Sequence, residues 1–338
     1  MNPSQWSAAV VGLGQVGSRF DAEPGRKTVW SHVGAYLALP ETFRLAAACE
    51  IDCGNVEAFS QRCTDVPVFG DVAEMLAVAK PAVVSVCTPA QTHSAIVRQI
   101  AKDPNVRAIW CEKPLDADID AARAMVAACA DQGKRLVVSY VRRWNPVWVA
   151  ARKHIEAGAV GRVRSVRIAL PNRVLSMGSH AIDLIAFLGG PLDAVVPFVL
   201  PELAEEGEPA VSAFVRLRAG GFGLYQVTGL KHNYLVEGEI VGDTGRMTVR
   251  EDLAWISLEH FAPSVRYKGY RELEPPKVEK IEIAADFSPF VAIAREIDAL
   301  LRGVRVRATC DGQQAFETQT VVDALAQAAA DAQCRTIG

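Results

Sequence analysis

The chain has 338 residues, of which 50% are hydrophobic and 22% are charged, and its formal net charge is −3. This balance is typical of a soluble globular protein, and the chain is long enough for two domains that each have a core. Because the small negative charge provides no basic field for phosphate backbones, we expect no nucleic-acid partner.

The start of the chain, MNPSQWSAAVVGLG, has neither a cationic lead nor an apolar stretch of signal length, so we expect a cytoplasmic protein. Residues 181–200 have the hydropathy of a membrane span. Two aspartates, a Gly-Gly pair and two prolines within them favour a buried helix, a turn and a strand instead, and we expect no membrane association. Eight cysteines without paired C-x-x-C spacing and six histidines without H-x-x-x-H spacing predict reduced thiols and no metal site.

The first 140 residues alternate apolar runs of strand length with segments of helical periodicity. Strands are predicted at 6–11, 43–50, 82–87, 107–111 and 135–140, and helices at 31–39, 71–79, 93–101 and 119–133. Strands buried on both faces read as continuous apolar runs, and the alternation with helices implies right-handed crossovers. The sequence therefore predicts a doubly wound parallel sheet, a Rossmann domain, over residues 1–141.

Directly after the first strand, VVGLGQVGSRF carries the pattern G-x-G-x-x-G. The first glycine permits a tight turn, the second lets a pyrophosphate approach the backbone, and the third allows close packing of helix and strand. The helix N-terminus that follows supplies N–H donors to the phosphates. This position in a β-α-β series predicts a dinucleotide site, whereas the pattern alone arises easily by chance. We expect the cofactor to contact Gly12, Leu13, Gly14, Gln15, Val16 and Gly17.

The same pattern calls for an acidic residue at the end of the second strand, where it binds the adenosine ribose. Glu50, followed by Ile51, stands there, 38 residues after Gly12 instead of about 20. The segment FDAEPGRKTVW interrupts the first crossover and accounts for the excess. An acid at this point repels a 2′-phosphate, so we expect NAD(H) rather than NADP(H). Asp52 is a competing candidate, and a structural cap at the strand end explains either residue.

Ligands of an open parallel sheet bind beyond the carboxyl ends of its strands. The runs VCTPAQTH and WCEKPL follow two such ends. They place Thr88, Pro89, His93, Glu112, Lys113 and Pro114 along the edge where a nicotinamide binds. Surface exposure is the ordinary explanation for a single lysine, but an acid and a proline flank Lys113 at this edge and indicate a functional side chain.

After residue 141 the pattern changes to short runs with turn signals such as AGG and GDTG between them. Strands are predicted at 162–170, 210–219, 222–230, 234–242 and 246–250, and helices at 180–188, 287–302 and 312–332. Several strands alternate polar and apolar side chains, which suits an antiparallel sheet with one covered face. We expect a second, α+β domain over residues 142–338 with a mainly antiparallel sheet.

Six motifs, GLGQVG, CTPAQTH, CEKPL, YVRRWNP, GSHAIDL and IVGDTGRM, stand in the order in which a known family carries them. Across almost its whole length, the chain thereby resembles the glucose–fructose oxidoreductase and inositol dehydrogenase (Gfo/Idh/MocA) family of NAD(P)-dependent oxidoreductases. The resemblance implies a C-terminal domain whose large open sheet forms the interface of a homodimer or homotetramer. It also implies that Lys113 and His180 act on a substrate carbinol.

Physical chemistry agrees with these two catalytic roles. Hydride transfer from a C–H requires the neighbouring hydroxyl to lose its proton, and a histidine that titrates near neutral pH is suited to accept it. His180 follows Gly178 and Ser179, which look like a helix cap; a satisfied core histidine is the alternative. Lys113 then stabilises the partial alkoxide, and Glu112 orients this lysine rather than contacting substrate.

One position departs from the family pattern, which often has an aspartate four residues before this histidine. Ser176 stands there, and a hydroxyl cannot stabilise the imidazolium as a carboxylate would. Asp183, one turn along the helix, is either a substitute or a structural cap.

Further polar residues are candidates for substrate binding. Arg142, Arg143 and Arg173 suit a diphosphate, and Tyr140 and Asn172 suit sugar hydroxyls, with solvated arginines as the ordinary alternative. The predicted substrate-binding residues are Lys113, Tyr140, Arg142, Asn172, Arg173, Ser176 and His180.

The sequence predicts a NAD-dependent oxidoreductase that interconverts a secondary alcohol and a ketone on a sugar, a nucleotide sugar or a cyclitol. Two alternatives stay open. A lyase or glycosidase would use transient oxidation by a retained cofactor, and a non-enzymatic regulator would sense NAD. The presence of both Lys113 and His180 weighs against the regulator.

Overall fold

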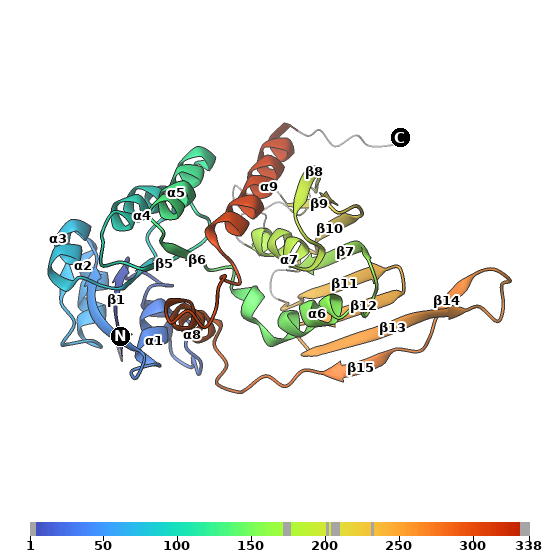
Figure 1. Ribbon diagram of the computed structural model, residues 1–338, viewed down its shortest axis with the longest axis horizontal. Coiled ribbons are helices and arrows are strands. Elements are labelled where there is room, and N and C mark those ends of the chain that lie inside the picture. Colours follow the sequence, from blue (N-terminus) through green and yellow to red (C-terminus); the bar gives the residue numbers. More distant parts are fainter. Residues whose placement is uncertain (1–4, 172–176, 201–202, 204–209, 231–232, 332–338) are drawn as a thin grey trace. The chain divides into compact units, whose positions relative to one another are not determined.

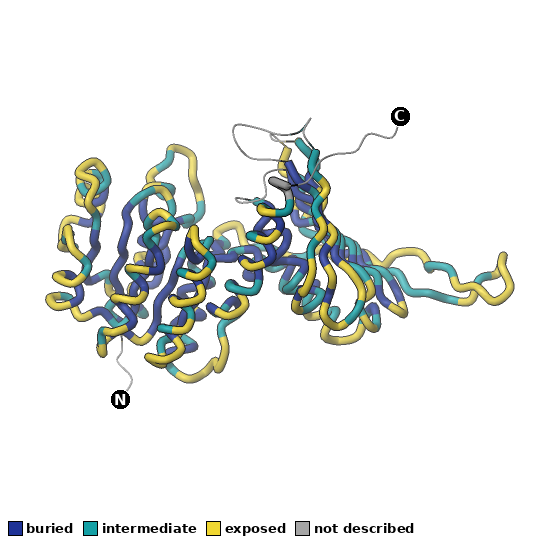
Figure 2. Tube along the Cα trace, turned by 90° about the horizontal axis from the view of Figure 1, so that it is seen from above, coloured by how far each residue is buried: buried dark blue, intermediate teal, exposed yellow. Residues whose placement is uncertain are grey.

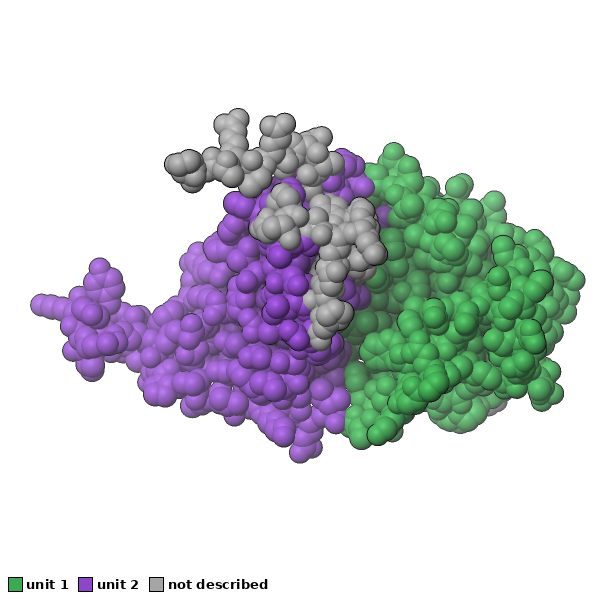
Figure 3. All heavy atoms as spheres, turned by 180° about the vertical axis from the view of Figure 1, so that it is seen from behind, with its two compact units in different colours: residues 1–144, 284–316 green, residues 145–283, 317–338 purple. Residues whose placement is uncertain are grey.

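The computed structural model describes residues 5–171, 177–200, 203, 210–230 and 233–331. Contacts between Cα atoms divide the chain into two compact units, residues 1–144 with 284–316 and residues 145–283 with 317–338 (Figure 3). Each unit has its own hydrophobic core, and the buried stretches follow the strands (Figure 2). Within the described ranges, no helix combines the length and hydropathy needed to cross a membrane.

The first unit contains a parallel sheet, with the described strands in the order β3-β2-β1-β4-β5-β6. Helices α4 and α5 lie on one side of this sheet, and helices α1 and α8 lie on the other (Figure 1). Coverage of both faces explains why the central strands consist almost entirely of buried apolar residues. The order reverses between β1 and β4, which is the switch point where such sheets bind ligands. The predicted Rossmann fold is confirmed.

The strands of this unit are β1 (Trp6–Val11), β2 (Phe43–Cys49), β3 (Val68–Phe69), β4 (Val83–Val86), β5 (Ala108–Cys111) and β6 (Arg135–Val138). Its helices are η1 (Arg19–Ala22), α1 (His32–Leu37), α2 (Cys53–Ser60), α3 (Val72–Ala79), η2 (Ala90–Thr92), α4 (His93–Ala101), α5 (Ile119–Asp131), η3 (Val141–Trp144) and α8 (Pro289–Leu301). The predicted strands and helices of this half are all present, and α2, β3 and the short helices η1, η2 and η3 are additions to them.

Helix α8 belongs to the first unit although it follows the second sheet in the sequence. We expected residues 284–316 in the second domain, because the predicted boundary divided the chain only once. In the structure, Phe290, Ile293 and Ile297 join the core of the first unit. The indole N–H of Trp6 also donates to Asp298 Oδ1 at 2.8 Å. The first unit is therefore formed by two separate segments of the chain.

The second unit contains a mixed sheet in the order β14-β13-β12-β11-β7-β10-β9-β8, with β15 paired to β13. Among its described strands, only β10 and β7 pair in parallel, so the predicted mainly antiparallel sheet is confirmed. Helices α6 and α7 pack against one face. Alternate residues of β8 to β10 are exposed, and the rings of Phe198, Phe214 and Phe222 lie in a row with centroids 5.9 and 6.0 Å apart.

The elements of this unit are α6 (Pro146–Glu156), β7 (Val163–Leu170), α7 (Ser179–Gly189), β8 (Leu192–Val199), β9 (Val211–Leu217), β10 (Phe222–Val227), β11 (Glu237–Gly242), β12 (Gly245–Arg250), β13 (Trp255–Pro263), β14 (Arg271–Leu273) and β15 (Lys277–Lys280). Helix α9 (Gly312–Asp331) starts in the first unit and ends in the second. The apolar segment 181–200 forms helix α7, a turn and strand β8, as the aspartates, glycines and prolines within it predict.

Candidate active site

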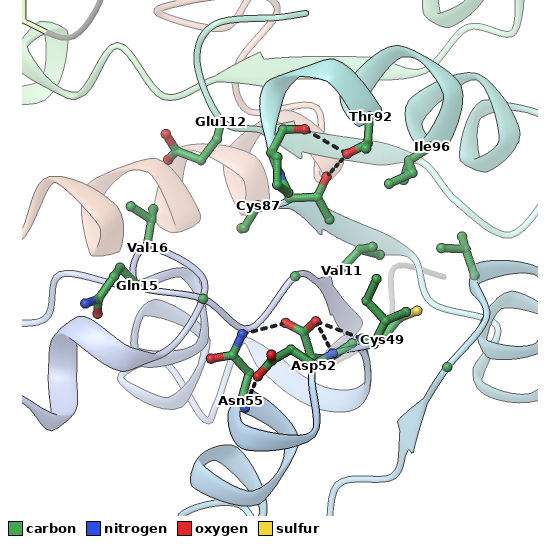
Figure 4. Close-up of a pocket in the computed structure, with 18 of the residues that line it drawn as sticks. Val11, Gln15, Val16, Cys49, Asp52, Asn55, Cys87, Thr92, Ile96 and Glu112 are labelled. Carbon is green, nitrogen blue, oxygen red and sulfur yellow. Dashed lines mark hydrogen bonds between the residues drawn. The ribbon is translucent and has the colours of Figure 1, made fainter.

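A pocket of about 770 Å³ lies in the first unit along the carboxyl ends of strands β1 to β5. Ligand pockets typically occupy about 300–1,000 Å³, so this volume suits a ligand of cofactor size. Figure 4 shows Cys87 and Thr92, which follow β4, on one side of the pocket and Asp52 and Asn55, which follow β2, on the opposite side. The pocket therefore lies where the strand order predicts a binding site.

The glycine loop has the form that a bound dinucleotide requires. Gly12 has a φ of +89°, and a Cβ there would lie 2.8 Å from the backbone of Cys87 and Thr88. A Cβ at Gly17 would lie 2.0 Å from the carbonyl oxygen of Gly12, so this position packs the turn against the strand. At Gly14 a Cβ would meet no atom within 4 Å, and this residue lines the pocket. The loop therefore leaves open space at the glycine that a pyrophosphate approaches.

Helix α1 continues the glycine loop after an interruption. The chain forms a turn over residues 14–18, leaves it, and returns at His32, whose N–H donates to Val16 O at 3.1 Å. In an uninterrupted helix, the carbonyl oxygen of Val16 would accept the N–H of the residue four positions later, and here it accepts that of His32. Asp21 closes the base of the excursion by accepting the N–H of Trp30 at 2.6 Å. The predicted interruption of the first crossover is thus a loop inserted between the turn at residues 14–18 and helix α1.

The carboxylate of Glu50 is held by the protein on both oxygens. Oε2 accepts the N–H of Leu13, in the glycine loop, at 2.7 Å and the side-chain amide of Asn55 at 3.3 Å. Oε1 accepts the N–H groups of Ile51 at 2.7 Å and Asp52 at 3.0 Å. Asp52 instead caps helix α2 by accepting the N–H of Asn55 at 2.8 Å. Both acids line the pocket, and Glu50 also organises the loop that approaches the phosphates.

Lys113 and Glu112 line the same pocket where strand β5 ends. The side chain of Glu112 is only 14% exposed. Burial alone would raise the pKa of Glu112, but hydrogen bonds with His32 and Ser139 and the charge of Lys113 hold this pKa below its ordinary value. The pocket therefore contains a carboxylate anion next to the lysine.

His93 joins the two loops that carry these pocket residues. Its ring is 1% exposed, with Nδ1 2.9 Å from Pro114 O and Nε2 2.6 Å from Thr88 O. Both partners are carbonyl oxygens, so the two hydrogen bonds form together only when each ring nitrogen carries a hydrogen. We expected His93 to contact the cofactor. It does not line the pocket, because its ring is used to hold the loops after β4 and β5 together.

The pocket brings together most of the predicted cofactor-binding residues. Its lining includes Gly12, Gly14, Gln15, Val16, Glu50, Ile51, Thr88, Pro89, Glu112 and Lys113. Leu13 and Gly17 support the loop instead, since Leu13 is fully buried and Gly17 packs against Gly12. The individual contacts of these residues with a cofactor stay predictions.

Several pocket residues were missed by the sequence analysis. They include Cys49, Asn55, Asp71, Cys87, Thr92, Ile96 and Gln99. Strand β3 is only two residues long, and helix α2 has few apolar positions, so neither gave a periodic signal. The available signal was an aspartate directly before helix α2 and another directly before helix α3. Asp52 and Asp71 each accept an N–H of the first turn of the helix that follows. Burial raises the pKa of Cys87 well above its ordinary value, so this pocket thiol is neutral.

The predicted residues of the second half are less completely described. His180 lies in the first turn of α7 and is 6% exposed. Asp183 is also buried and accepts the hydroxyl of Thr318 at 3.3 Å, which favours a structural role for this acid. Asn172, Arg173 and Ser176 lie outside the described residues. His180 and Lys113 belong to different units, and their joint action on one substrate oxygen stays a prediction.

Tyr140, Arg142 and Arg143 are buried rather than solvated, with exposures of 2%, 9% and 3%. Arg143 donates to the carbonyl oxygen of Thr309 at 2.9 Å and to Gln314 Oε1 at 3.2 Å. This guanidinium thus ties η3 to the segment that follows α8. Solvation does not explain these arginines, and a role in substrate binding stays a prediction for Tyr140 and Arg142.

Residues 6–140 match the family model described as an oxidoreductase family with an NAD-binding Rossmann fold. Inositol 2-dehydrogenase of Rhizobium meliloti (strain 1021) is 38% identical over 85 residues, which are 25% of this chain and 25% of that protein. Levoglucosan dehydrogenase of Pseudarthrobacter phenanthrenivorans is 32% identical over 135 residues, covering 33% of this chain and 34% of that protein. The chain therefore matches a quarter to a third of the length of these two relatives.

Among solved structures, the WlbA dehydrogenase of Bordetella pertussis, in complex with NADH and UDP-GlcNAcA, has a TM-score of 0.73 and 21% identity. The likeness covers 97% of each chain, so the fold is shared by both units. The glycine loop and the acid at the end of β2 fit the cofactor of the matched family model. Residues 6–140 of the chain therefore match the Gfo/Idh/MocA family model of oxidoreductases with an NAD-binding Rossmann fold, as the motifs of this half predict.

Proposed function

We propose that this protein is a NAD-dependent oxidoreductase that interconverts a secondary alcohol and a ketone on a sugar, a nucleotide sugar or a cyclitol. The observation that carries the proposal is a shared pocket, because the glycine loop, Glu50 and Lys113 line one cavity. Relatives named as inositol and levoglucosan dehydrogenases support the substrate class. When bound there, nicotinamide dinucleotide supplies the acceptor or the donor of the hydride.

Lys113 is the residue to which we assign stabilisation of charge on the substrate oxygen. An ammonium group at the edge of the cofactor pocket is suited to donate a hydrogen bond to that oxygen as negative charge develops on it. Ionised Glu112 favours the protonated form of a neighbouring lysine. We therefore assign Lys113 as an electrostatic stabiliser and His180 as the group that accepts the hydroxyl proton in oxidation and returns it in reduction.

The proposed preference for NAD over NADP rests on the acids at the end of β2. Glu50 and Asp52 both line the pocket next to the segment where the adenosine ribose binds in this fold. Two carboxylates there oppose a 2′-phosphate. The proposed cofactor preference is independent of the proposed chemistry. If the preference is wrong, the proposed hydride transfer is unaffected.

We also propose self-association through the second sheet. The exposed row of Phe198, Phe214 and Phe222 supports this part of the proposal, because a contiguous apolar patch on a sheet favours burial against another surface. The cytoplasmic location stays a prediction.

The test is a turnover assay with NAD and each of three alcohols, inositol, levoglucosan and UDP-GlcNAcA. The reaction is monitored through the absorbance of reduced nicotinamide. The proposal expects reduced nicotinamide to accumulate with at least one of these alcohols, and the Lys113→Ala variant to lose that signal. Cleavage or elimination without a net change in absorbance would support the lyase or glycosidase alternative. Tight NAD binding without conversion of any member of the panel would support the regulator.

A further inference from the structure

A chain of buried hydrogen bonds ends on Glu112. The ring of His32 is fully buried, with Nε2 3.0 Å from Glu112 Oε1 and Nδ1 3.0 Å from Ser85 Oγ. Ser85 Oγ in turn lies 2.8 Å from the hydroxyl of Tyr36. The imidazole also packs against the ring of Trp110, with a centroid distance of 3.8 Å and an interplanar angle of 38°. The position of His32 is therefore fixed by the side chains around it as well as by helix α1.

The direction of each hydrogen bond follows from the charge states. Burial lowers the pKa of His32 although Glu112 opposes the shift, so the ring is neutral and has one donor and one acceptor nitrogen. An ionised carboxylate only accepts, so Nε2–H donates to Glu112 and Nδ1 accepts from Ser85. Burial raises the pKa of Tyr36, whose phenol then donates to Ser85. In this series of hydrogen bonds, each donor points toward Glu112.

A second arm reaches the same carboxylate from strand β5 and the end of β6. The indole N–H of Trp110 donates to Ser139 Oγ at 2.9 Å, and the hydroxyl of Ser139 hydrogen-bonds to Glu112. The other titratable groups that interact with this cluster include His93 on α4, Cys87 after β4, Cys111 at the end of β5 and Lys113 itself. The two arms solvate the carboxylate in place of water.

We propose that His32 is a positioning residue for Lys113: with Ser85 it keeps Glu112 ionised and oriented, and this carboxylate fixes the charge of the lysine at the pocket edge. His32 acts through Glu112 and contacts neither cofactor nor substrate. Without its hydrogen bond, burial favours the neutral carboxylic acid, and the protonated lysine loses the anion that stabilises it. The part of this inference that concerns turnover rests on the proposed oxidoreductase function.

The first experiment requires no activity. Protein labelled with ¹³C at the glutamate carboxyl carbons is titrated between about pH 5 and pH 8, and the Glu112 signal is assigned by its loss in Glu112→Gln. In the native protein this signal stays at the position of an ionised carboxylate. In His32→Leu it moves with pH within that range, whereas His32→Gln, which retains an amide donor and a carbonyl acceptor, restores the native behaviour. A Glu112 signal that titrates identically in the native protein and in His32→Leu overturns the proposal.

Two further variants separate the inference from a general loss of folding. Ser85→Ala removes the donor to His32 Nδ1, together with the acceptor of the Tyr36 hydroxyl, and moves the Glu112 titration in the same direction by a smaller amount. His154→Gln breaks a histidine–glutamate pair in the second unit, where Nε2 lies 2.8 Å from Glu279, and leaves the Glu112 titration unchanged. If His32→Leu does not fold, a native Glu112 titration in Ser85→Ala overturns the proposal.

The second experiment measures turnover against pH. In His32→Leu, kcat/KM falls about tenfold for each pH unit below the midpoint of Glu112, because only the ionised form supports Lys113. Addition of His32→Leu to Glu112→Gln causes no further change in the pH profile. An unchanged profile in His32→Leu, with Glu112 titrating as expected, rejects the link to Lys113. Absence of turnover in every variant and in the native protein contradicts the proposed function and leaves the outcome of the titration intact.

Discussion

The replacement of Glu50 by glutamine tests whether this residue organises the glycine loop as well as the ribose end of the pocket. Glutamine preserves the length of the side chain but converts one carboxylate oxygen into an NH₂ group. Each oxygen of Glu50 accepts two hydrogen bonds, one set with Leu13 and Asn55 and the other with Ile51 and Asp52. Whichever oxygen is replaced, two donors then face a donor.

The size of the expected loss in stability and in cofactor affinity follows from the number and type of hydrogen bonds to Glu50. A hydrogen bond to a charged group contributes about 1.5–3 kcal/mol to stability, and the partly exposed position of Glu50 places the loss at the lower end of this range. Because the Leu13 N–H fixes the loop that approaches the pyrophosphate, we expect the affinity for NAD to fall roughly tenfold, corresponding to about 1.4 kcal/mol, and the affinity for NADP to fall by a smaller factor. Loss of the negative charge relieves repulsion of the 2′-phosphate, so the NADP to NAD affinity ratio rises at the same time.

Isothermal titration of both dinucleotides into Glu50→Gln and Asp52→Ala measures these effects, with urea unfolding of the same samples. Asp52→Ala is the matched control, since it removes the cap of α2 at a cost of about 1 kcal/mol in unfolding free energy without touching the glycine loop. The affinity ratio should change more in Glu50→Gln than in Asp52→Ala. A native affinity for both cofactors in Glu50→Gln, together with a changed ratio in Asp52→Ala, would refute the reasoning and assign the ribose to Asp52.

Three further predictions follow from the same geometry. Lys113→Ala lowers turnover by about a hundredfold or more and changes the NAD dissociation constant only a few-fold, as steady-state kinetics and titration will show. Gly14→Val abolishes NAD binding with little loss of thermal stability, because its side chain enters open space, whereas Gly17→Ala lowers the melting temperature, because its Cβ meets the Gly12 carbonyl. Because the pKa of His32 is lowered in the folded protein, the unfolded chain binds the proton more readily. The contribution of neutral His32 to the free energy of unfolding is therefore fully present above its ordinary pKa of 6.5 and declines as the pH falls below that value. His32→Gln flattens this decline in urea unfolding at different pH values.

The sequence was sufficient to predict the elements that make a regular pattern. Strands β1, β4 and β5 are uninterrupted apolar runs, and α4 and α5 repeat apolar residues at helical spacing, so both types of element were found near their observed bounds. The glycine pattern identified the pocket because Gly12 and Gly17 meet steric requirements that a larger residue would not, and Gly14 leaves open space in the pocket. These features depend on neighbours in the sequence.

The features that were missed depend on contacts between distant segments. Helix α8 was placed in the second domain because its position in the chain says nothing of the core into which Phe290 packs. His32 was not recognised as part of the site because the excursion after the glycine loop separates it from Val16, with which it is continuous in space. For His93, the position at the sheet edge did not show that the two ring nitrogens lie against the carbonyl oxygens of Pro114 and Thr88, and its contact with the cofactor stays a prediction.

His32 connects the two halves of the pocket through different atoms, and this makes the two functions separable. Its backbone N–H donates to Val16 in the cofactor loop, while its side chain donates to Glu112 beside Lys113. A side-chain substitution retains the first bond and removes the second. His32→Leu should therefore keep native affinity for NAD while changing the charge of the lysine, and Glu50→Gln should do the reverse. Since the bonds of Glu50 and those of the His32 ring have no partner in common, the free-energy effects of the two substitutions should add. A strong loss of NAD affinity in His32→Leu would mean that the ring supports the loop as well, and the division between cofactor binding and control of the lysine would fail.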